Sequence, residues 1–367
     1  MNILILTSVG GSYNSVRPEL EIFVSLAKAG HTITIMTQKE NAYAQIFKEH
    51  GIEVIDARHD KKIDFNNILL AKKIIKEKKI DIVYATASRS ISNAIFACMG
   101  TDVKLVTYRG TTGGLYRYDP SAYLNALNTR VNGVICVSES VERHVKKQLI
   151  SKKTKAVTIY KGHDASWYNQ TPADLEEFGT KQGNFNIAFI ANVRPHKGLA
   201  YVLQALRDVA DLKDMHILLI GDKISQEPYI SEIKNSGMEG RIHVTGFRSD
   251  VPSIISACDV LVHASTRKEG LPRVILESLA SGIPVIASAN ESSLEIIEDG
   301  LNGFIVPIKD AKAIAQKIRE LHDSPETLQK LKEHAKDVIK GKMSHETTVK
   351  KYIEYFESLL KNQNTAI

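Results

Sequence analysis

Two glutamates eight residues apart, Glu269 and Glu277, are the most informative chemical groups in this sequence. Glu269 lies just before a predicted helix, and Glu277 lies about a turn and a half inside it. Between them stand Gly270, Leu271 and Pro272, and proline suits the first turn of a helix. A helix N-terminus offers free amide groups and a partial positive charge to a diphosphate, while carboxylates accept hydrogen bonds from sugar hydroxyls. The pattern therefore predicts a site for a sugar nucleotide.

The alternative interpretation is an ordinary surface pair. For two bare glutamates at this spacing, a loop carboxylate and a solvated helix carboxylate would be the simpler account. The neighbours of Glu277 argue against it, because they are mostly apolar: Val274, Ile275, Leu276, Leu279 and Ala280. A carboxylate without a function is costly to bury in such a helix.

Three further motifs, together with Glu269-x7-Glu277, resemble the family 4 retaining glycosyltransferases with the GT-B fold. Pro195-His196-Lys197-Gly198 resembles that family's Lys-Gly element, and Ile220-Gly221-Asp222 resembles its strand-end Gly-Asp. Residues 295–307 resemble its closing signature. The resemblance implies an α/β protein with two Rossmann-like, doubly wound domains facing each other across a cleft. It also implies a C-terminal helix that crosses back to the N-terminal domain.

The resemblance assigns roles on the donor side. It implies that Lys197 is the counter-charge for the donor diphosphate, that Glu269 holds hydroxyls of the donor sugar, and that Glu277 holds the nucleotide ribose. Gly221 and the helix start at Gly270-Leu271-Pro272 join them as donor-binding residues. For Lys197, an ordinary lysine at a helix start is the alternative.

One residue of the family pattern is missing. The family usually has an arginine five residues before the lysine, where this chain has Asn192. Arg194, two residues later, is the candidate substitute. The catalytic candidates are therefore Glu269, Lys197 and Arg194.

The N-terminal half offers fewer candidates. Gly10-Gly11 resembles the family's glycine loop, which implies that the Gly11 backbone approaches the donor phosphates and the acceptor. A dehydrogenase would need Gly-x-Gly-x-x-Gly here, and the sequence lacks it. Tyr108 and Arg109 stand at a strand end where many relatives carry His-Gly. A guanidinium cannot act as a base at neutral pH, so we expect Arg109 to bind an anion or a sugar hydroxyl on the acceptor side.

The implied reaction moves a sugar from a nucleotide-diphosphate sugar to a glycan or lipid-linked glycan, with retention of configuration. In this family such acceptors belong to cell-surface polysaccharide or lipopolysaccharide synthesis. The departing phosphate oxygen would take the proton of the acceptor hydroxyl. The chain has no Asp-x-Asp motif, so we expect neither a metal nor another cofactor. A nucleotide-sugar epimerase of the same fold and a catalytically silent sugar-nucleotide-binding protein stay open as alternatives.

Strands and helices that alternate along the chain must position these residues. With 367 residues, two domains are the better expectation. We expect an acceptor-binding domain over residues 1–168, a linker over 169–184, a donor-binding domain over 185–344 and a final helix segment over 345–367. The predicted strands are Asn2–Thr7, Thr32–Thr37, Ile80–Ala85, Lys104–Tyr108, Gly133–Val137, Phe185–Ile190, His216–Ile220, Ile242–Thr245, Asp259–His263, Pro284–Ala287 and Gly303–Val306.

Helical patterns fill the intervals. Gly30 and Gly51 stand where left-handed residues would end two of these helices. The predicted helices with clear limits are Pro18–Ala29, Ala42–Glu49, Asn66–Lys79, Ala311–His322, Pro325–Lys340 and His345–Lys361.

Cysteine usage and hydropathy bear on the compartment. Cys98, Cys136 and Cys258 lie in apolar stretches without metal-ligand spacing, as expected for buried thiols in a reducing environment. The opening apolar run is too short for a signal peptide, and no apolar stretch is long enough to span a bilayer. We therefore expect a cytoplasmic protein.

Charge is unevenly distributed. Residues 1–168 carry 24 Lys and Arg against 15 Asp and Glu, a net charge of +9, and the remainder carries −3. Two lysine clusters contribute: Lys72, Lys73, Lys76, Lys78 and Lys79, then Lys146, Lys147, Lys152, Lys153 and Lys155. Such runs are often solvated faces, but they also predict peripheral binding to an anionic membrane surface, such as the inner face of the plasma membrane. No motif indicates nucleic-acid binding.

Overall fold

The computed structural model describes residues 1–8, 13–39, 43–192, 194–267 and 269–361. The chain divides into two compact units, Met1–Gly162 with His345–Ile367, and His163–Ser344. The expected boundary at residue 168 and the expected linker 169–184 thus differ from this division, which groups residues 163–184 with the second unit. Each unit is described by itself.

The first unit is built on a seven-stranded, fully parallel sheet in the order β3-β2-β1-β4-β5-β6-β7. The central strands are buried, so they read as near-continuous apolar runs. The strands are β1 (Asn2–Leu6), β2 (Thr32–Thr37), β3 (Glu53–Asp56), β4 (Ile82–Ala85), β5 (Lys104–Arg109), β6 (Gly133–Cys136) and β7 (Lys155–Thr158). Five of these strands match the predictions within two residues, whereas β3 and β7 were not predicted.

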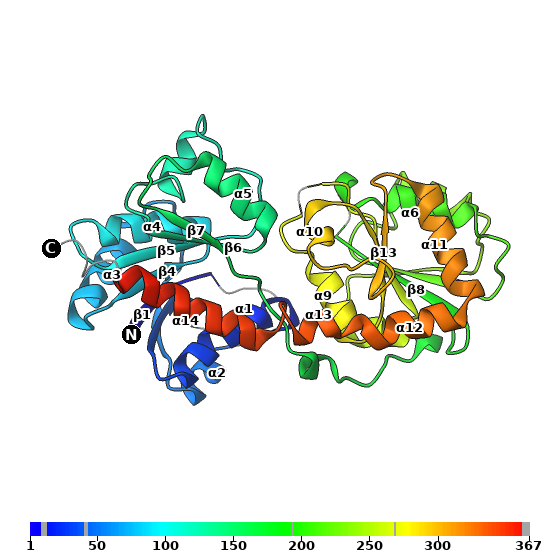
Figure 1. The fold of residues 1–367 in the computed structure, drawn as a ribbon, viewed down its shortest axis with the longest axis horizontal. Coiled ribbons are helices and arrows are strands. Elements are labelled where there is room, and N and C mark those ends of the chain that lie inside the picture. The colour runs from blue at the N-terminus through cyan, green and yellow to red at the C-terminus, as the bar shows by residue number, and fades with distance from the viewer. Residues whose placement is uncertain (9–12, 40–42, 193, 268, 362–367) are drawn as a thin grey trace. The chain divides into compact units, whose positions relative to one another are not determined.

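Helices cover both faces of this sheet. Figure 1 shows α4 and α5 on one side and α1, α2 and α14 on the other. The helices are α1 (Tyr13–Lys28), α2 (Ala44–Glu49), α3 (Phe65–Glu77), α4 (Ser88–Cys98), the 3-10 turn η1 (Pro120–Leu124), α5 (Glu139–Gln148) and α14 (His345–Lys361). Gly30 and Gly51 are left-handed, with φ of 87° and 68°, as predicted for residues that end helices.

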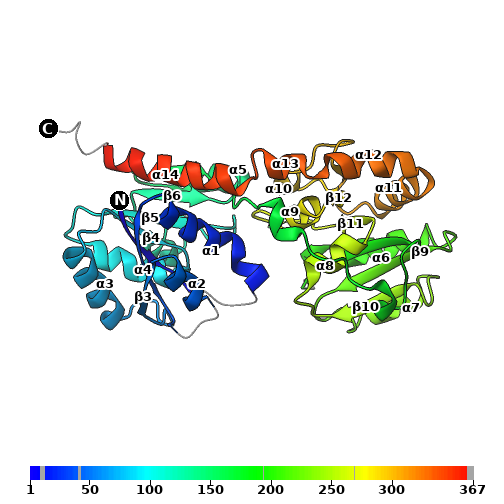
Figure 2. The same cartoon turned by 90° about the horizontal axis from the view of Figure 1, so that it is seen from below.

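The C-terminal helix α14 packs on the first unit, which confirms the predicted crossing. It lies beside α1 (Figure 1 and Figure 2). Tyr352 and Phe356 are buried in the same core as Tyr84, and the hydroxyls of Tyr84 and Tyr352 are 2.9 Å apart. The Tyr355 hydroxyl donates to the carbonyl of Lys155 at 2.6 Å. The last helix therefore completes the core of the first unit.

The second unit has a six-stranded parallel sheet in the order β10-β9-β8-β11-β12-β13. Its strands are β8 (Phe185–Ile190), β9 (Met215–Ile220), β10 (Ile242–Gly246), β11 (Val260–His263), β12 (Val285–Ser288) and β13 (Gly303–Val306). All six match predicted strands within one residue at each end. The chain leaves β8 toward β9 and returns on its other side at β11, so the order reverses between β8 and β11. Ligands of open α/β sheets bind at the carboxyl ends of strands at such a point.

The helical segments of this unit are η2 (Ala165–Tyr168), η3 (Leu175–Phe178), η4 (Pro195–Lys197), α6 (Leu199–Arg207), α7 (Tyr229–Lys234), α8 (Val251–Ala257), α9 (Arg273–Ala280), α10 (Glu291–Leu294), α11 (Ala311–Asp323), α12 (Pro325–Ala335) and α13 (Asp337–Lys340). The single helix predicted over Pro325–Lys340 is two helices in the structure, α12 and α13, separated at Lys336. The Lys336 side chain lies against Gly282, just after the end of α9. Within the described ranges, no helix is both long and apolar enough to cross a membrane.

Truncation before His345 should strongly destabilise the first unit. It removes Tyr352 and Phe356, and each large buried side chain contributes about 1.5–3 kcal/mol against a typical domain stability of about 5–15 kcal/mol. Differential scanning calorimetry should show the loss of one cooperative transition or its shift to lower temperature. A chain ending at Lys361 is the matched control and should melt like the full chain. Identical melting of the chain that ends at Ser344 would contradict the packing.

Candidate functional site

The loops that follow β8 and β11 meet at the carbonyl oxygen of His196. This oxygen accepts a hydrogen bond from the Thr266 amide at 2.8 Å, and the Ser265 hydroxyl oxygen lies 3.1 Å from it. Gly198 makes the approach possible, because a Cβ at this position would lie 2.0 Å from the carbonyl oxygen of Ala264. Its φ of 77° also favours glycine. The glycine of the Lys-Gly element is therefore a structural requirement of the site.

Lys197 and Glu269 form an ion pair across these two loops. Lys197 Nζ lies 2.6 Å from Glu269 Oε1, and the Ser265 hydroxyl donates to the same oxygen at 2.6 Å. Burial alone would raise the pKa of Glu269, but nearby His263 and Lys197 and the hydrogen bonds from Lys197 and Ser265 outweigh it. The pKa therefore lies below its usual value. Two residues expected to bind different parts of one ligand are thus already in contact.

His263 is a buried residue of this site that the motifs did not single out. It ends β11, and burial lowers its pKa to about 4, with nearby Glu269 opposing the shift and Lys197 adding to it. The imidazole is therefore neutral at neutral pH. Among the described residues, its Nδ1 has no hydrogen-bond partner. The only signal in the sequence was its place at the carboxyl end of a predicted strand, where ligands of such sheets bind.

Glu277 is buried inside α9, and Arg273 lies beside it. Glu277 is 4% exposed, and its Oε1 lies 2.9 Å from Arg273 Nε. Burial raises the pKa of Glu277 to about 7, and the smaller opposing effect of Arg273 does not cancel it. The expectation that this carboxylate occupies a costly, buried position is confirmed. Its contact with a ribose stays a prediction.

The loop before α9 has the predicted form. Pro272 is the residue that caps α9, Gly270 is buried, and Leu271 is partly exposed. The Pro272 carbonyl accepts the Ile275 amide at 3.1 Å, which begins the helix. The free amides of this helix start are available to an anion, and diphosphate binding there stays a prediction.

Gly221 follows β9 and approaches the end of β8. A Cβ at Gly221 would lie 1.9 Å from the Ala191 carbonyl oxygen, and its φ is 140°. Only glycine fits there. Arg194 directly precedes η4, one turn before Lys197, and is exposed, as is Asn192. No ion pair of the Arg194 guanidinium occurs within the described part of the chain, so its substitution for the family arginine stays a prediction.

The candidates of the first unit belong to separate interactions, and Gly11 lies outside the described residues. The Arg109 guanidinium donates to the carbonyls of Thr111, at 2.8 Å, and Gly113, both in its own loop. The ring of Tyr108 instead contacts Lys161, whose Nζ lies 4.5 Å from the ring centroid. The structure therefore does not join Arg109 and Tyr108 in one cluster.

Lys161 belongs to a polar cluster at the carboxyl ends of β1 and β4 that sequence reasoning missed. Its Nζ lies 2.9 Å from Glu19 Oε2, and Thr7 donates to Glu19 at 3.3 Å. Thr7 and Thr86, which follow β1 and β4, have hydroxyls 2.7 Å apart. The strand order reverses between these two strands, so the cluster marks the expected ligand edge of the first sheet. Glu19 and Lys161 are 142 residues apart, and no motif connects them.

Two family models match this chain, one in each half. The model described as Glycosyl transferases group 1 matches residues 170–338, and the model described as Glycosyltransferase Family 4 matches residues 20–167. These matches agree with the two parallel-sheet units and with the contact between the loops after β8 and β11. The chain belongs to the family 4-type glycosyltransferases of the GT-B fold.

Relatives and solved structures agree with this family. N-acetyl-alpha-D-glucosaminyl L-malate synthase of Bacillus anthracis is 25% identical over 97% of this chain and 96% of its own. UDP-Gal:alpha-D-GlcNAc-diphosphoundecaprenol alpha-1,3-galactosyltransferase of Escherichia coli is 24% identical over 67% of each chain. The structure of Anabaena Alr3699/HepE in complex with UDP and glucose is similar, with a TM-score of 0.77 at 21% identity, covering 98% of this chain and 100% of that one.

The raised pKa of Glu277 predicts a stability difference that depends on pH. Between its ordinary value of 4.5 and about 7, the folded state holds a proton that the unfolded chain has lost, so folding stability falls as pH rises through this window. Glu277→Gln removes that loss, which amounts to about 2–3 kcal/mol. The melting temperature of Glu277→Gln relative to the native chain should therefore rise by several degrees from pH 5 to pH 8, at about 2–4 °C per kcal/mol.

Differential scanning fluorimetry across this pH range makes the measurement. Glu326→Gln, at an exposed position of α12, is the matched control and should keep a constant difference from the native chain. A constant difference for Glu277→Gln as well would show that Glu277 is not buried as described.

Proposed function

We propose that this protein is a retaining glycosyltransferase that uses a nucleotide-diphosphate sugar as donor, held by the second unit, and an acceptor held by the first. The observation that carries the proposal is the Lys197–Glu269 pair at the β8–β11 reversal, with Glu277 buried in the helix that follows. Hydroxyl-binding carboxylates and a phosphate-binding cation at one strand edge suit a sugar nucleotide. The similarity to Alr3699/HepE, which was crystallised with UDP and glucose, supports this donor class.

Each part of the nucleotide sugar would be bound by different residues of the site. Lys197 would neutralise the diphosphate together with Arg194 and the amides at the start of α9, and Glu269 would accept hydrogen bonds from the sugar. Glu277 would accept hydrogen bonds from the ribose. Burial raises the pKa of Glu277 to about 7. Hydrogen bonds donated by the ribose hydroxyls would lower this pKa again, because they favour the ionised carboxylate.

The acceptor is a glycan or a lipid-linked glycan, in cell-surface polysaccharide or lipopolysaccharide synthesis. The support is the similarity to the Escherichia coli enzyme, whose name specifies a diphosphoundecaprenol-linked acceptor. We place the reaction in the cytoplasm, in keeping with three buried free thiols, Cys98, Cys136 and Cys258. Arg109 and Tyr108 remain the acceptor-side candidates.

Catalysis would consist of charge stabilisation and positioning. The bond from the anomeric carbon to the diphosphate breaks while the acceptor oxygen bonds to the same face of that carbon. The leaving phosphate oxygen takes the hydroxyl proton, so no protein base is required. Lys197 stabilises the charge that develops on the leaving group, in a site where its geometry is already fixed by Glu269 and Ser265.

Lys197→Ala and Glu277→Ala should each lower transfer about a hundredfold or more, because losing a charged contact to the transition state costs a few kcal/mol. The donor is chosen first, as the UDP-, GDP- or ADP-sugar that most raises the melting temperature of the native chain. The rate at which each variant turns over that donor then measures the effect. Lys213→Ala and Glu326→Ala, both at exposed positions of the second unit, are the matched controls and should retain activity. Near-normal turnover in Lys197→Ala and Glu277→Ala would refute the site.

The same assay separates the alternatives. An epimerase would convert the donor to a new sugar nucleotide without any acceptor, and a silent binding protein would bind the donor without turnover. Retention is read from the anomeric configuration of the product by proton NMR, and an inverted product would refute the proposed mechanism.

Transfer should continue in the presence of a chelator. No Asp-x-Asp motif occurs in the chain, and among the residues that the structure describes no group of three or more His, Cys, Asp or Glu side chains is arranged to hold a metal ion. The rate with excess EDTA should equal the rate with added magnesium or manganese. A rate that vanished with EDTA and returned with either metal would overturn metal independence.

A further inference from the structure

The exposed large apolar side chains of the first unit gather on one layer of helices. Right-handed crossovers in the observed strand order place α3, α4, η1 and α5 on the face of the sheet opposite α1 and α2. We call this the α3–α5 layer; Figure 1 shows α4 and α5 on that side. Apart from Tyr13 on α1, every such side chain in the described part of the unit belongs to this layer or its connecting segments: Ile63, Phe65, Leu69, Met99, Tyr118, Tyr123 and Ile150.

Helix α3 presents an exposed face that combines apolar and basic side chains. Phe65 is 75% exposed and Leu69 is 66% exposed, and they are one turn apart on the helix. Lys72 and Lys76 continue the same stripe at intervals of three and four residues, and both are exposed. Two apolar side chains are thus followed along one exposed face by two cations.

The segment that leads into this face is held in place. The Asp64 amide donates to Asn93 on α4 at 2.8 Å, and the Asn93 side-chain amide donates to the Lys61 carbonyl at 3.1 Å. The Ser92 hydroxyl donates to the carbonyl of Lys62. Ile63 and Phe65 are therefore presented by a fixed backbone, so little ordering is needed on binding.

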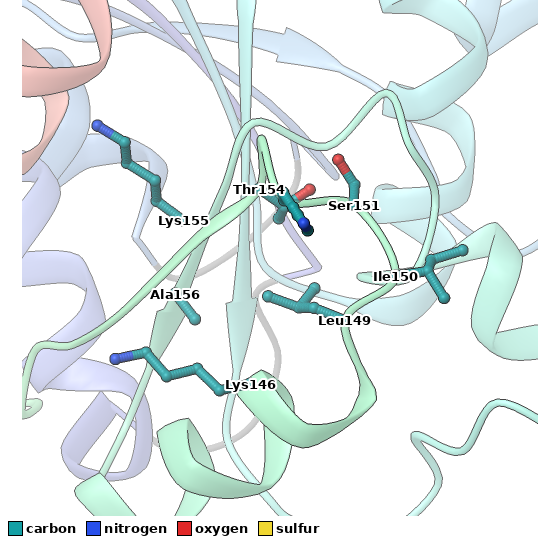
Figure 3. A pocket seen from close by; sticks show the side chains of 8 residues that line it. Lys146, Leu149, Ile150, Ser151, Thr154, Lys155 and Ala156 are labelled. Carbon is teal, nitrogen blue, oxygen red and sulfur yellow. The ribbon is translucent and has the colours of Figure 1, made fainter.

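The end of α5 repeats the combination of exposed apolar and basic groups. A cavity of about 470 Å³ lies there, lined by Lys146, Leu149, Ile150, Ser151, Lys152, Thr154, Lys155 and Ala156. In Figure 3, the amino groups of Lys146 and Lys155 point to the same side, while Ile150 lies on the other. Arg117 donates to the carbonyls of Lys147, Gln148 and Leu149, which ties this turn to the loop that carries exposed Tyr118.

The structure also separates the two lysine clusters into paired and unpaired cations. Lys78 lies 2.5 Å from Glu53, Lys146 lies 2.5 Å from Glu142, and Lys73 lies 3.9 Å from Glu77. Within the described residues, no carboxylate forms an ion pair with the other seven lysines of the two clusters: Lys72, Lys76, Lys79, Lys147, Lys152, Lys153 and Lys155. These seven carry uncompensated positive charge.

We propose that the α3–α5 layer docks on an anionic lipid bilayer, with Phe65 and Leu69 inserted among the acyl chains and the lysines at the headgroup phosphates. A bilayer suits this face because its exposed apolar side chains lie beside lysines. The apolar side chains match the acyl chains of the bilayer, and the lysines match the anionic headgroups above them. Lysine side chains are long enough to reach headgroups while their stems lie along the apolar surface. The proposal goes beyond the transfer reaction, and its test involves no turnover, so either can fail without the other.

Co-sedimentation of the full chain with vesicles tests the docking. The native chain should bind phosphatidylcholine vesicles that contain phosphatidylglycerol, should bind pure phosphatidylcholine far more weakly, and should dissociate as salt is raised. Lys72→Gln with Lys76→Gln should weaken binding about 25-fold, at about fivefold for each lysine near an anionic surface. The matched control is Lys350→Gln with Lys361→Gln, two exposed lysines of α14, and should bind like the native chain.

Insertion has its own test. Phe65→Ser should lose most vesicle binding, whereas Phe247→Ser, at a residue of the second unit that is 63% exposed, should lose none. A Phe65→Trp variant should show a blue shift in fluorescence when the anionic vesicles are added. The proposal is overturned if the native chain stays in the supernatant, if the α14 control loses as much binding as the α3 variant, or if Phe65→Trp fluorescence does not shift.

Discussion

The carbonyl oxygen of His196 joins the two loops on which the proposed donor site depends. The Thr266 amide donates to it and the Ser265 hydroxyl oxygen lies 3.1 Å away, so the loop after β8 is set against the loop after β11. Lys197 follows His196 directly, and Ser265 also holds Glu269, so the ion pair forms as a consequence. Gly198 is required because any side chain there would collide with the backbone of Ala264.

The two carboxylates of the site differ in the number of contacts that stabilise their ionised form. Glu269 has a cation and a hydroxyl on one oxygen, and its pKa is lowered. Glu277 is more deeply buried, with Arg273 on one oxygen, and its pKa is raised to about 7. Burying a carboxylate whose pKa is raised costs stability at neutral pH, which is the usual trade between stability and function in a binding site.

The sequence predicted those parts of the fold that have a local signal. Phe185–Ile190 is a mostly apolar run and forms β8 with the predicted limits, whereas β3 (Glu53–Asp56) and β7 (Lys155–Thr158) are four-residue edge strands that contain charged residues. Motif spacing predicted Lys197, Glu269 and Glu277 as separate site residues. Their contacts could not be predicted, because Lys197 and Glu269 are 72 residues apart and meet only through tertiary packing. His263 and the Glu19–Lys161 pair were missed for the same reason.

In the proposed mechanism, Lys197 receives the donor diphosphate, and Glu269 holds the Lys197 side chain in position until the donor binds. Isothermal titration of the nucleoside diphosphate that the native chain prefers, against Glu269→Gln and Lys197→Ala, tests this most directly. Glu269→Gln frees the Lys197 cation and removes a negative charge beside the diphosphate, so it should bind the diphosphate more tightly than the native chain. Lys197→Ala should bind it far more weakly. If Glu269→Gln bound no more tightly, or Lys197→Ala bound equally well, the diphosphate would not be received by this pair.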